Sequence, residues 1–450
     1  MIFASVPIAQ LRTWLTGLLG QWRYGISALD QIALSVFGFA LNLVLVRALS
    51  ATEYGIVSLW MAMALLAIGI QNALVSAPLS VHVNAAPDPA SARRLASALA
   101  VVNLLTVGLT TLVIVLVNLT VDAEWEPHDP VAWIAIPIFV AAGMYREYYR
   151  SLAFSRNNMP MLLWVDGPYL AVTSVCLAAM FLWPERMASL AGAFLAMTAG
   201  CIVSQFFLTG RFAGPRPRPL RREWIDDYRP VVPDAGWALI GVLTTHLHAR
   251  SYLYVIVNLV GLAGLAAINV VGILFRPVRI MITAWGRTAL PELAGHLAAG
   301  RVDSFDRTVA RAFVLAGIGS GAWLVALWIG WRPIEKHFLA GNYPDAWLLL
   351  WPWAVAAGIE AMSSTIAIAL QAARDFKFLA FGTMLSAPVT IVATTAAVLW
   401  QGYTWTMYGV AIGNLVLLVA TLLRLRRARR KFAAAPSPLA ATPGRSGESG

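Results

Sequence analysis

Long apolar segments separated by short polar loops run through this chain of 450 residues, from about Tyr24 to Leu423. A transmembrane helix needs about 20 mostly apolar residues, each adding about 1.5 Å of rise. Because lipid offers no partners for backbone N–H and C=O groups, each such segment must be helical. Twelve segments are long enough: 24–46, 56–81, 95–118, 131–153, 160–182, 187–209, 233–257, 264–285, 308–330, 347–370, 378–400 and 404–423. The pattern predicts an all-α, polytopic membrane protein with twelve transmembrane helices.

The longest polar stretch between two of these segments, residues 210–232, is rich in arginine and proline and divides the twelve predicted helices into six and six. An even number of spans before the linker gives both halves the same orientation in the membrane. We therefore expect two six-helix lobes, residues 24–209 and 233–423, joined by a basic cytoplasmic linker.

The two ends of the chain carry different signals. Within residues 1–23, apolar side chains recur at helical spacing, which predicts an amphipathic helix on the cytoplasmic surface of the membrane. A frayed tail is the alternative. These residues also lack the features of a cleavable signal peptide. Residues 424–450 begin with a basic cluster and continue into a Pro-, Ser- and Gly-rich stretch, which predicts a disordered cytoplasmic tail.

The distribution of basic residues predicts the topology. With the N-terminus in the cytoplasm, 27 Lys and Arg residues fall in cytoplasmic segments, counted with the adjoining parts of spans, and 4 fall in external ones. Such asymmetry sets the orientation of membrane proteins, so we expect both termini to be cytoplasmic. The loop 122–129, with four acids, belongs outside. The net charge of +11 is then explained by contact with anionic lipid, without a nucleic-acid partner.

Several residues within the predicted spans bear on their shape. Prolines remove a backbone donor and predict kinks; those within spans are Pro78, Pro137, Pro168, Pro277, Pro352 and Pro388. The two cysteines, Cys176 and Cys201, also fall within spans, where packing is their expected role. We expect no metal site and no cofactor. Because the sequence has no nucleotide-binding loop, we expect energy to come from an ion gradient or from the substrate's own gradient.

Ionisable side chains inside a bilayer are costly and therefore mark candidate functional sites. The arginines are Arg146, Arg150, Arg250, Arg276 and Arg279, and the acids are Asp30, Glu147, Asp166 and Glu360. His246 lies four residues before Arg250, which places both on one face of their helix.

Structural roles for these charges remain open alternatives. Arg146, Arg150, Arg279 and Asp30 lie near the cytoplasmic ends of their spans, where long side chains can reach water. Asp166 can bridge to a neighbouring Asn or Arg. Near the middle of its span, Glu360 can form a structural ion pair with Arg250 or Arg276, although such a pair adds little net stability.

The sign of these charges indicates the class of substrate. The arginines of the second half predict a cavity that is cationic on at least one side. Because the guanidinium presents a fork of donors that fits phosphate oxygens, such a cavity favours a diphosphate or another anionic head group. Uncharged polar residues in the spans are candidates for hydrogen bonds to sugar hydroxyls or for helix packing: Asn42, Gln71, Asn72, Asn103, Ser363, Ser364 and Thr365.

Short motifs along the whole chain resemble one family. Residues 47–55 (RALSATEYG), 291–293 (PEL), 371–374 (QAAR) and 409–413 (GVAIG) resemble, in this order, the pattern of polysaccharide flippases of the multidrug/oligosaccharidyl-lipid/polysaccharide exporter superfamily. Ser50 and Ala51 replace the usual Gly-Pro at the first motif. The resemblance implies alternating access of two lobes and transfer of an undecaprenyl-diphosphate-linked oligosaccharide to the periplasmic leaflet of the bacterial inner membrane. It also implies glycosyltransferases and a polysaccharide polymerase as partners.

In that interpretation, Arg250, Arg276, Arg279 and Arg146 attract the diphosphate. Asp30, Glu360 and His246 are candidates for coupling to protons or cations. The alternative within the superfamily is a cation-coupled multidrug exporter that uses Asp30 and Glu360 as cation ligands. A membrane glycosyltransferase or polymerase is a further alternative. We expect no enzyme activity, because the external loops are too short for a sizeable catalytic site.

Overall fold

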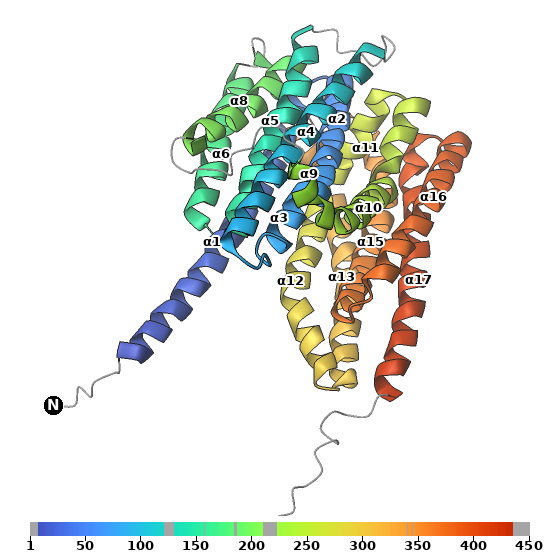
Figure 1. Ribbon diagram of the computed structural model, residues 1–450. Coiled ribbons are helices and arrows are strands. Elements are labelled where there is room, and N and C mark those ends of the chain that lie inside the picture. Colours follow the sequence, from blue (N-terminus) through green and yellow to red (C-terminus); the bar gives the residue numbers. More distant parts are fainter. Residues whose placement is uncertain are drawn as a thin grey trace, which may run out of the picture. The chain divides into compact units, whose positions relative to one another are not determined.

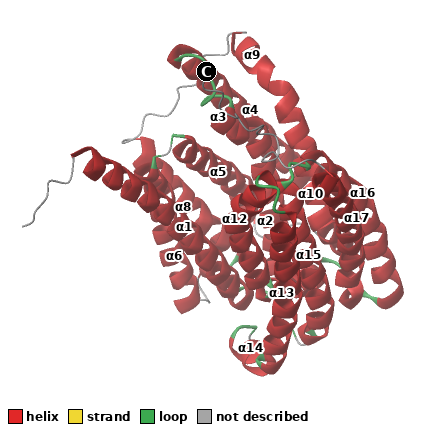
Figure 2. Ribbon diagram, turned by 90° about the horizontal axis from the view of Figure 1, so that it is seen from below, coloured by secondary structure: helices red, strands yellow, loops and turns green. Residues whose placement is uncertain are grey.

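The computed structural model describes residues 8–120, 130–156, 158–183, 187–209, 223–339, 341–343 and 345–434. Throughout these ranges the regular structure is helical, with no strand, as Figure 2 shows. The all-α fold class is therefore confirmed. Outside these residues lie the acidic loop 122–129, the linker from 210 to 222 and the tail after residue 434.

The chain forms two compact units, Met1–Val242 and Leu243–Gly450. The helices up to the division are α1 (Ile8–Ala48), α2 (Ala51–Gln71), the π-helix η1 (Asn72–Ser76), α3 (Ala77–Val81), α4 (Pro89–Thr120), α5 (Pro130–Ser155), α6 (Met159–Leu182), α8 (Leu190–Thr209), α9 (Glu223–Tyr228), the 3₁₀ turn η2 (Arg229–Val231) and α10 (Val232–Leu259). The division falls inside α10, which is one helix from Val232 to Leu259. Figure 1 labels the helices. The lobe boundaries 24–209 and 233–423 stay a prediction.

The second unit continues from α10 through a similar series of helices. They are α11 (Leu262–Leu274), α12 (Arg276–Ala298), α13 (Val302–Ile329), α14 (Trp331–His337), the 3₁₀ turn η3 (Ala346–Leu349), α15 (Leu350–Ala372), α16 (Phe376–Gln401), the 3₁₀ turn η4 (Tyr403–Trp405) and α17 (Thr406–Ala434).

Ten stretches of the described chain have the length and composition of membrane spans. Nine are single spans, and α11 with α12 forms a tenth that is bent by 48°. This bend lies beside Pro277, one of the prolines predicted to kink a span. Helices α5 and α10 are also long, at 26 and 28 residues, and carry the charged side chains Arg146 and Arg250. The structure thus supports a multi-pass membrane protein, while the count of twelve and the cytoplasmic termini stay predictions.

Several helices extend well beyond their predicted apolar spans. Helix α1 begins at Ile8, so residues 8–23 are continuous with the first span rather than a separate helix. Their location along a membrane surface stays a prediction. Helix α12 ends at Ala298 and α17 at Ala434, both past the ends predicted from apolar length.

The first family-like motif has a clear local structural role. Ser50 is the N-cap of α2, and its side chain accepts a hydrogen bond from the backbone N–H of Glu53, whose carboxylate in turn bonds the Ser50 N–H. This reciprocal capping box satisfies backbone donors at the helix start. Tyr54 follows, almost fully buried, and donates to Oδ1 of Asn42 at 3.1 Å. The motif therefore fixes the turn between α1 and α2.

The last motif brings two helices close together. A Cβ atom added at Gly409 or Gly413 of α17 would collide with Thr394 or Thr390 of α16, respectively. Only glycine allows this approach, so the GVAIG motif is explained by packing of α17 on α16.

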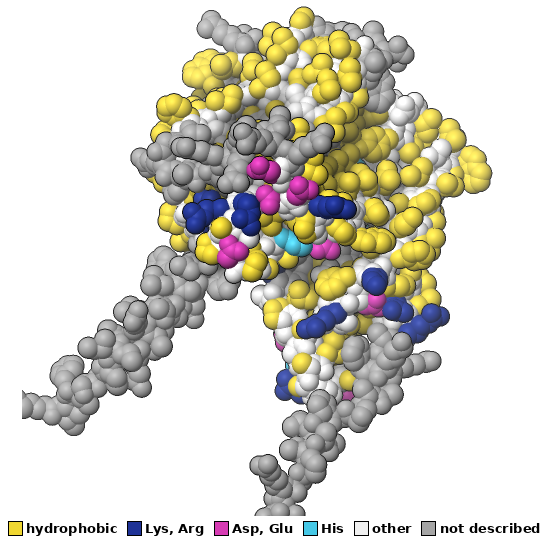
Figure 3. Space-filling view, in the orientation of Figure 1, with side chains coloured by type: hydrophobic (Ala, Val, Ile, Leu, Met, Phe, Trp, Pro, Cys, Tyr) yellow, Lys and Arg dark blue, Asp and Glu magenta, His cyan; other side chains and the backbone are white. Residues whose placement is uncertain are grey.

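Each unit has its own apolar core. That of the first unit includes Val75, Leu99, Leu152 and Leu162, and that of the second includes Leu293, Ile366 and Ala369. On the face that Figure 3 shows, most of the helical surface is hydrophobic and charged side chains gather near one end of each unit. This distribution is expected of helices in lipid whose charged ends reach water.

Candidate functional site

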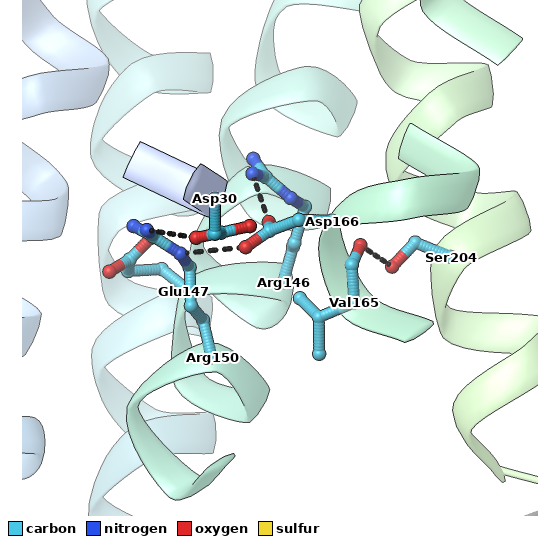
Figure 4. A network of polar contacts seen from close by, with 7 residues as sticks. All are labelled: Asp30, Arg146, Glu147, Arg150, Val165, Asp166 and Ser204. Carbon is cyan, nitrogen blue, oxygen red and sulfur yellow. Dashed lines mark hydrogen bonds and ion pairs between the residues drawn. The ribbon is translucent and has the colours of Figure 1, made fainter. Parts of the chain in front are cut away.

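The first unit contains a charged network on three helices, drawn in Figure 4. Arg146 of α5 donates from Nη2 to Oδ1 of Asp166 on α6 at 2.6 Å. Arg150, one turn later on α5, donates from Nε to Oδ2 of the same carboxylate at 2.9 Å and from Nη2 to Asp30 of α1 at 3.1 Å. Glu147 lies 3.8 Å from Arg150. Two arginines and three acids thus form one network of ion pairs.

This network is almost closed to solvent. The side chain of Asp166 is 1% exposed, and those of Arg146 and Arg150 are 13% exposed. The guanidinium of Arg146 also lies over the ring of Tyr169, 3.8 Å from its centroid, which adds a cation–π contact. Beside Asp166, the carbonyl of Val165 accepts a hydrogen bond from Ser204 of α8. The network therefore ties α1, α5, α6 and α8 together.

Sequence reasoning anticipated part of this arrangement. The expected bridge from Asp166 to a neighbouring arginine is present, whereas the alternative that Arg146, Arg150 and Asp30 simply reach water does not describe this network. Because the acids here outnumber the arginines, the cationic character predicted for a cavity is not found at this place in the first unit. Its assignment to substrate binding through Arg146 stays a prediction.

Uncharged polar residues of the first unit mainly join helices. Gln71 donates from Nε2 to Oδ1 of Asn103 at 2.6 Å and to the carbonyl of Met144 at 2.7 Å. Oδ1 of Asn42 accepts a hydrogen bond from the hydroxyl of Tyr54. The sequence left two roles open for these amides, hydrogen bonds to sugar hydroxyls and packing between helices. The contacts seen here join helices.

The second unit holds a basic cluster around Tyr252. Arg250, Arg276, Arg279 and Glu360 all lie close enough to Tyr252 to act electrostatically on its hydroxyl. Tyr252 itself donates to Oδ1 of Asn269 on α11 at 3.0 Å. Three arginines against one acid leave an excess of positive charge. The net charge of this Tyr252 cluster is positive, while the predicted cavity and the assignment of Arg250, Arg276 and Arg279 to substrate binding stay predictions.

The ion pair in this cluster differs from the predicted one. Glu360 of α15 pairs with Arg279, at 3.1 Å between Oε2 and Nη2, rather than with Arg250 or Arg276. The bend between α11 and α12 begins α12 at Arg276, and Arg279 lies one turn into the new helix. The redirected helix therefore presents Arg279 to α15. Both side chains are more than one-third exposed, which leaves them accessible to a ligand.

One face of α10 carries His246, Arg250 and Tyr254 at intervals of four residues. Nε2 of His246 lies 2.9 Å from the hydroxyl of Tyr254. Arg250 sits between them along the helix, as their spacing predicts. Arg250 makes no ion pair with any side chain in the described ranges.

His248 makes a contact that the sequence did not indicate. Its ring is buried, and Nδ1 lies 3.0 Å from the hydroxyl of Ser386 and 3.3 Å from that of Thr390, both on α16. Two residues from either of them, His248 lies off the face of α10 that His246 and Arg250 share. Its partners are about 140 positions away in the chain, and no local spacing points to them.

These two clusters differ in chemistry. The first is a closed network whose charges are paired, which suits a structural or conformational role. The Tyr252 cluster is open and carries excess positive charge, which suits an anion. Among the residues that the structure describes, no group of three or more His, Cys, Asp or Glu side chains is arranged to hold a metal ion.

No protein-family model and no curated protein sequence matches this chain. Solved structures do match its fold. An inward-facing multidrug resistance MATE family transporter of the MOP superfamily gives a TM-score of 0.68 at 13% identity, over 89% of this chain and 94% of that one. The lipid II flippase MurJ, in an inward closed conformation, gives 0.66 at 10% identity, over 90% of each chain. A MOP superfamily transporter from Pyrococcus furiosus gives 0.57 at 13% identity, over 90% of this chain and 93% of that one. The chain shares the fold of these transporters.

Proposed function

We propose that this protein is a transporter of the MOP superfamily, the multidrug/oligosaccharidyl-lipid/polysaccharide group, and that it moves a lipid-linked oligosaccharide across the bacterial inner membrane. The substrate is an undecaprenyl-diphosphate-linked repeat unit of an O-antigen or exopolysaccharide, carried to the periplasmic leaflet by alternating access of two lobes. Glycosyltransferases that build this unit and a polymerase that consumes it are the expected partners.

The arrangement of charge is the observation that carries this proposal. Each of the four acids predicted to lie within the membrane has an arginine within 4 Å. Carboxylates held in this way are poor ligands for a lipophilic cation, because binding it would require breaking an existing ion pair. Arg250, in contrast, makes no ion pair with a described residue. A diphosphate fits the Tyr252 cluster better than a cationic drug does.

Roles for individual residues follow from their surroundings. Arg250 and Arg276 contact the diphosphate, and Arg279 joins them when its pair with Glu360 opens. Arg146 acts from within its closed network and positions α5 and α6 rather than touching the substrate first. Asp30, Glu360 and His246 are the proposed proton-responsive groups, since each is bonded to a partner that a change of protonation would weaken.

The second candidate is a cation-coupled multidrug exporter. It is favoured by the match in fold to a multidrug resistance MATE family transporter, the highest TM-score among the three comparisons given. At 13% identity or less these likenesses concern the fold, and they support either substrate. None of the three neighbours is named as an enzyme, and we propose that this chain performs no covalent chemistry.

Deletion of the gene separates the two candidates. We expect loss of a surface or secreted polysaccharide and retention of its lipid-linked repeat unit in the cytoplasmic leaflet, with unchanged sensitivity to cationic dyes. Restoration by the wild-type gene is the control. Intact polysaccharide together with increased dye sensitivity would make the exporter the correct assignment.

A further inference from the structure

The second membrane span, Ala51–Val81, is interrupted in its second half. Helix α2 ends at Gln71, the π-helix η1 covers Asn72–Ser76, and α3 follows with Pro78 in its first turn. In an α-helix the N–H of residue 78 would donate to the carbonyl of Leu74, but proline has no N–H. Short π-helices and prolines are the usual sites of helix bending. The segment 72–78 therefore has the features of a hinge.

A side chain from far along the sequence satisfies the carbonyl at this hinge. The hydroxyl of Tyr228 donates to the carbonyl oxygen of Leu74 at 2.9 Å. Burial raises the pKa of Tyr228 above its ordinary value near 10, so the hydroxyl keeps its proton at neutral pH. Tyr228 belongs to α9, the short helix within the predicted linker 210–232. Thus α9 supplies a donor at the position where Pro78 removes one.

Packing and surface charges hold α9 against the same region. Trp224 and Tyr228 pack on the apolar core around Val75, Leu79 and Leu99, and α9 contacts α4, beside which it lies in Figure 1. Arg94 of α4 pairs with Asp227 of α9 at 3.7 Å, and His82 pairs with Asp234 at the start of α10 at 3.1 Å. Because both pairs are partly exposed, each adds little. The hydroxyl of Tyr228 is the specific contact.

We propose that α9 is a latch that holds the hinge at 72–78 in its present form through the Tyr228 hydroxyl. In the chain, α9 continues through η2 directly into α10, and α10 crosses the division between the two units. A displacement of the start of α10 therefore acts on Tyr228 and through it on the second span. Release of the latch during transport rests on the proposed alternating access, whereas the latch itself is a property of the first unit alone.

Hydrogen–deuterium exchange of the full chain in nanodiscs tests the latch without any substrate. Tyr228→Phe keeps the ring and removes only the hydroxyl. We expect exchange of the amides in residues 72–82 to rise about three- to tenfold, the effect of losing one net hydrogen bond. The matched control is Tyr148→Phe, because Tyr148 lies in the same apolar core and its buried hydroxyl has no hydrogen-bond partner among the residues that the structure describes. It should leave exchange of 72–82 unchanged.

A double-mutant cycle with Pro78→Ala makes the test specific. This substitution restores a backbone N–H that can donate to Leu74, so the added effect of Tyr228→Phe should fall to less than twofold. An unchanged exchange rate in the single variant Tyr228→Phe overturns the proposal, as does an equal rise in the presence and absence of Pro78. Since neither readout involves transport, failure of the latch and failure of the proposed function are distinguishable.

Discussion

Arg150 of α5 donates a hydrogen bond from Nε to Oδ2 of Asp166 on α6 at 2.9 Å. The same carboxylate accepts from Arg146, and Arg150 also contacts Asp30, so Asp166 and Arg150 are the two shared members of the network. Arg150 contacts Asp166, Asp30 and Glu147, and Asp166 contacts both arginines. The Arg150–Asp166 pair therefore links α1, α5 and α6.

Removing Asp166 should destabilise the protein more than removing Asp30. Asp166→Ala leaves two arginines without their shared acceptor, and breaking a buried ion pair in this way costs about 3–5 kcal/mol. Asp30→Ala removes one bond to Arg150, which keeps Asp166 as a partner. Thermal unfolding of the purified protein in detergent measures the difference. Equal midpoints for the two variants would show that the network is not centred on Asp166.

Outside the membrane, Asp88 at the start of α4 predicts a pH dependence. Its carboxylate accepts from the hydroxyl of Ser91 and from the N–H groups of Ser91 and Ala90, and these hydrogen bonds hold its pKa below the ordinary value of an aspartate. A lowered pKa gives stability that is present above the unfolded value, about 3.9, and is lost as pH falls through the folded value. We expect Asp88→Ala to unfold at a lower temperature than wild type at pH 7, and this difference to shrink as pH falls below about 3.9. A difference that persists at low pH would contradict this.

The predicted spans correspond to the observed helices where apolar length decides the structure. Their ends were less predictable, because a hydropathy pattern reports the lipid-facing length, whereas helices such as α12 and α17 continue with polar residues to Ala298 and Ala434. Pro277 correctly indicated the bend in the eighth span.

Partners of the buried charges were harder to predict than their positions. The four-residue spacing of His246 and Arg250 correctly placed them on one face of α10, because the helical repeat fixes which residues share a face. The pairing of Glu360 with Arg279 depends on the direction that α12 takes after its bend, and the contacts of His248 depend on how α16 packs. Such contacts join residues far apart in the chain, where spacing carries no information.

A substitution of Glu360 tests whether the net positive charge of the Tyr252 cluster serves to bind an anion. Glu360→Gln removes its only acid and frees Arg279, so binding of undecaprenyl diphosphate to the purified protein should become tighter, about two- to tenfold. The matched control is Glu335→Gln on α14, an acid for which no ion pair is recorded in the described part of the chain. If Glu360→Gln instead weakened binding of the diphosphate and abolished binding of a cationic dye, the protein would be the exporter.

Topology can be tested in the segments that carry the strongest charge signal. Single cysteines in 122–129, 215–222 and the tail after residue 434, on a background without Cys176 and Cys201, report their side of the membrane to an impermeant thiol reagent. In intact spheroplasts we expect labelling of the acidic loop alone, because 27 basic residues lie in cytoplasmic segments against 4 in external ones. Labelling of the linker or tail without the loop would invert the orientation.

The most direct test of the account is transfer of a polyprenyl-diphosphate-linked saccharide across proteoliposomes that contain the purified protein. We predict transfer by wild type and by Arg311→Ala, an exposed arginine of α13 outside the Tyr252 cluster. Arg250→Ala should lose transfer while reconstituting normally, and Arg250→Lys should keep only part of it, since the charge remains without the forked donors. Transfer by Arg250→Ala at the wild-type rate, or no transfer by wild type beyond that of empty liposomes, would contradict the account.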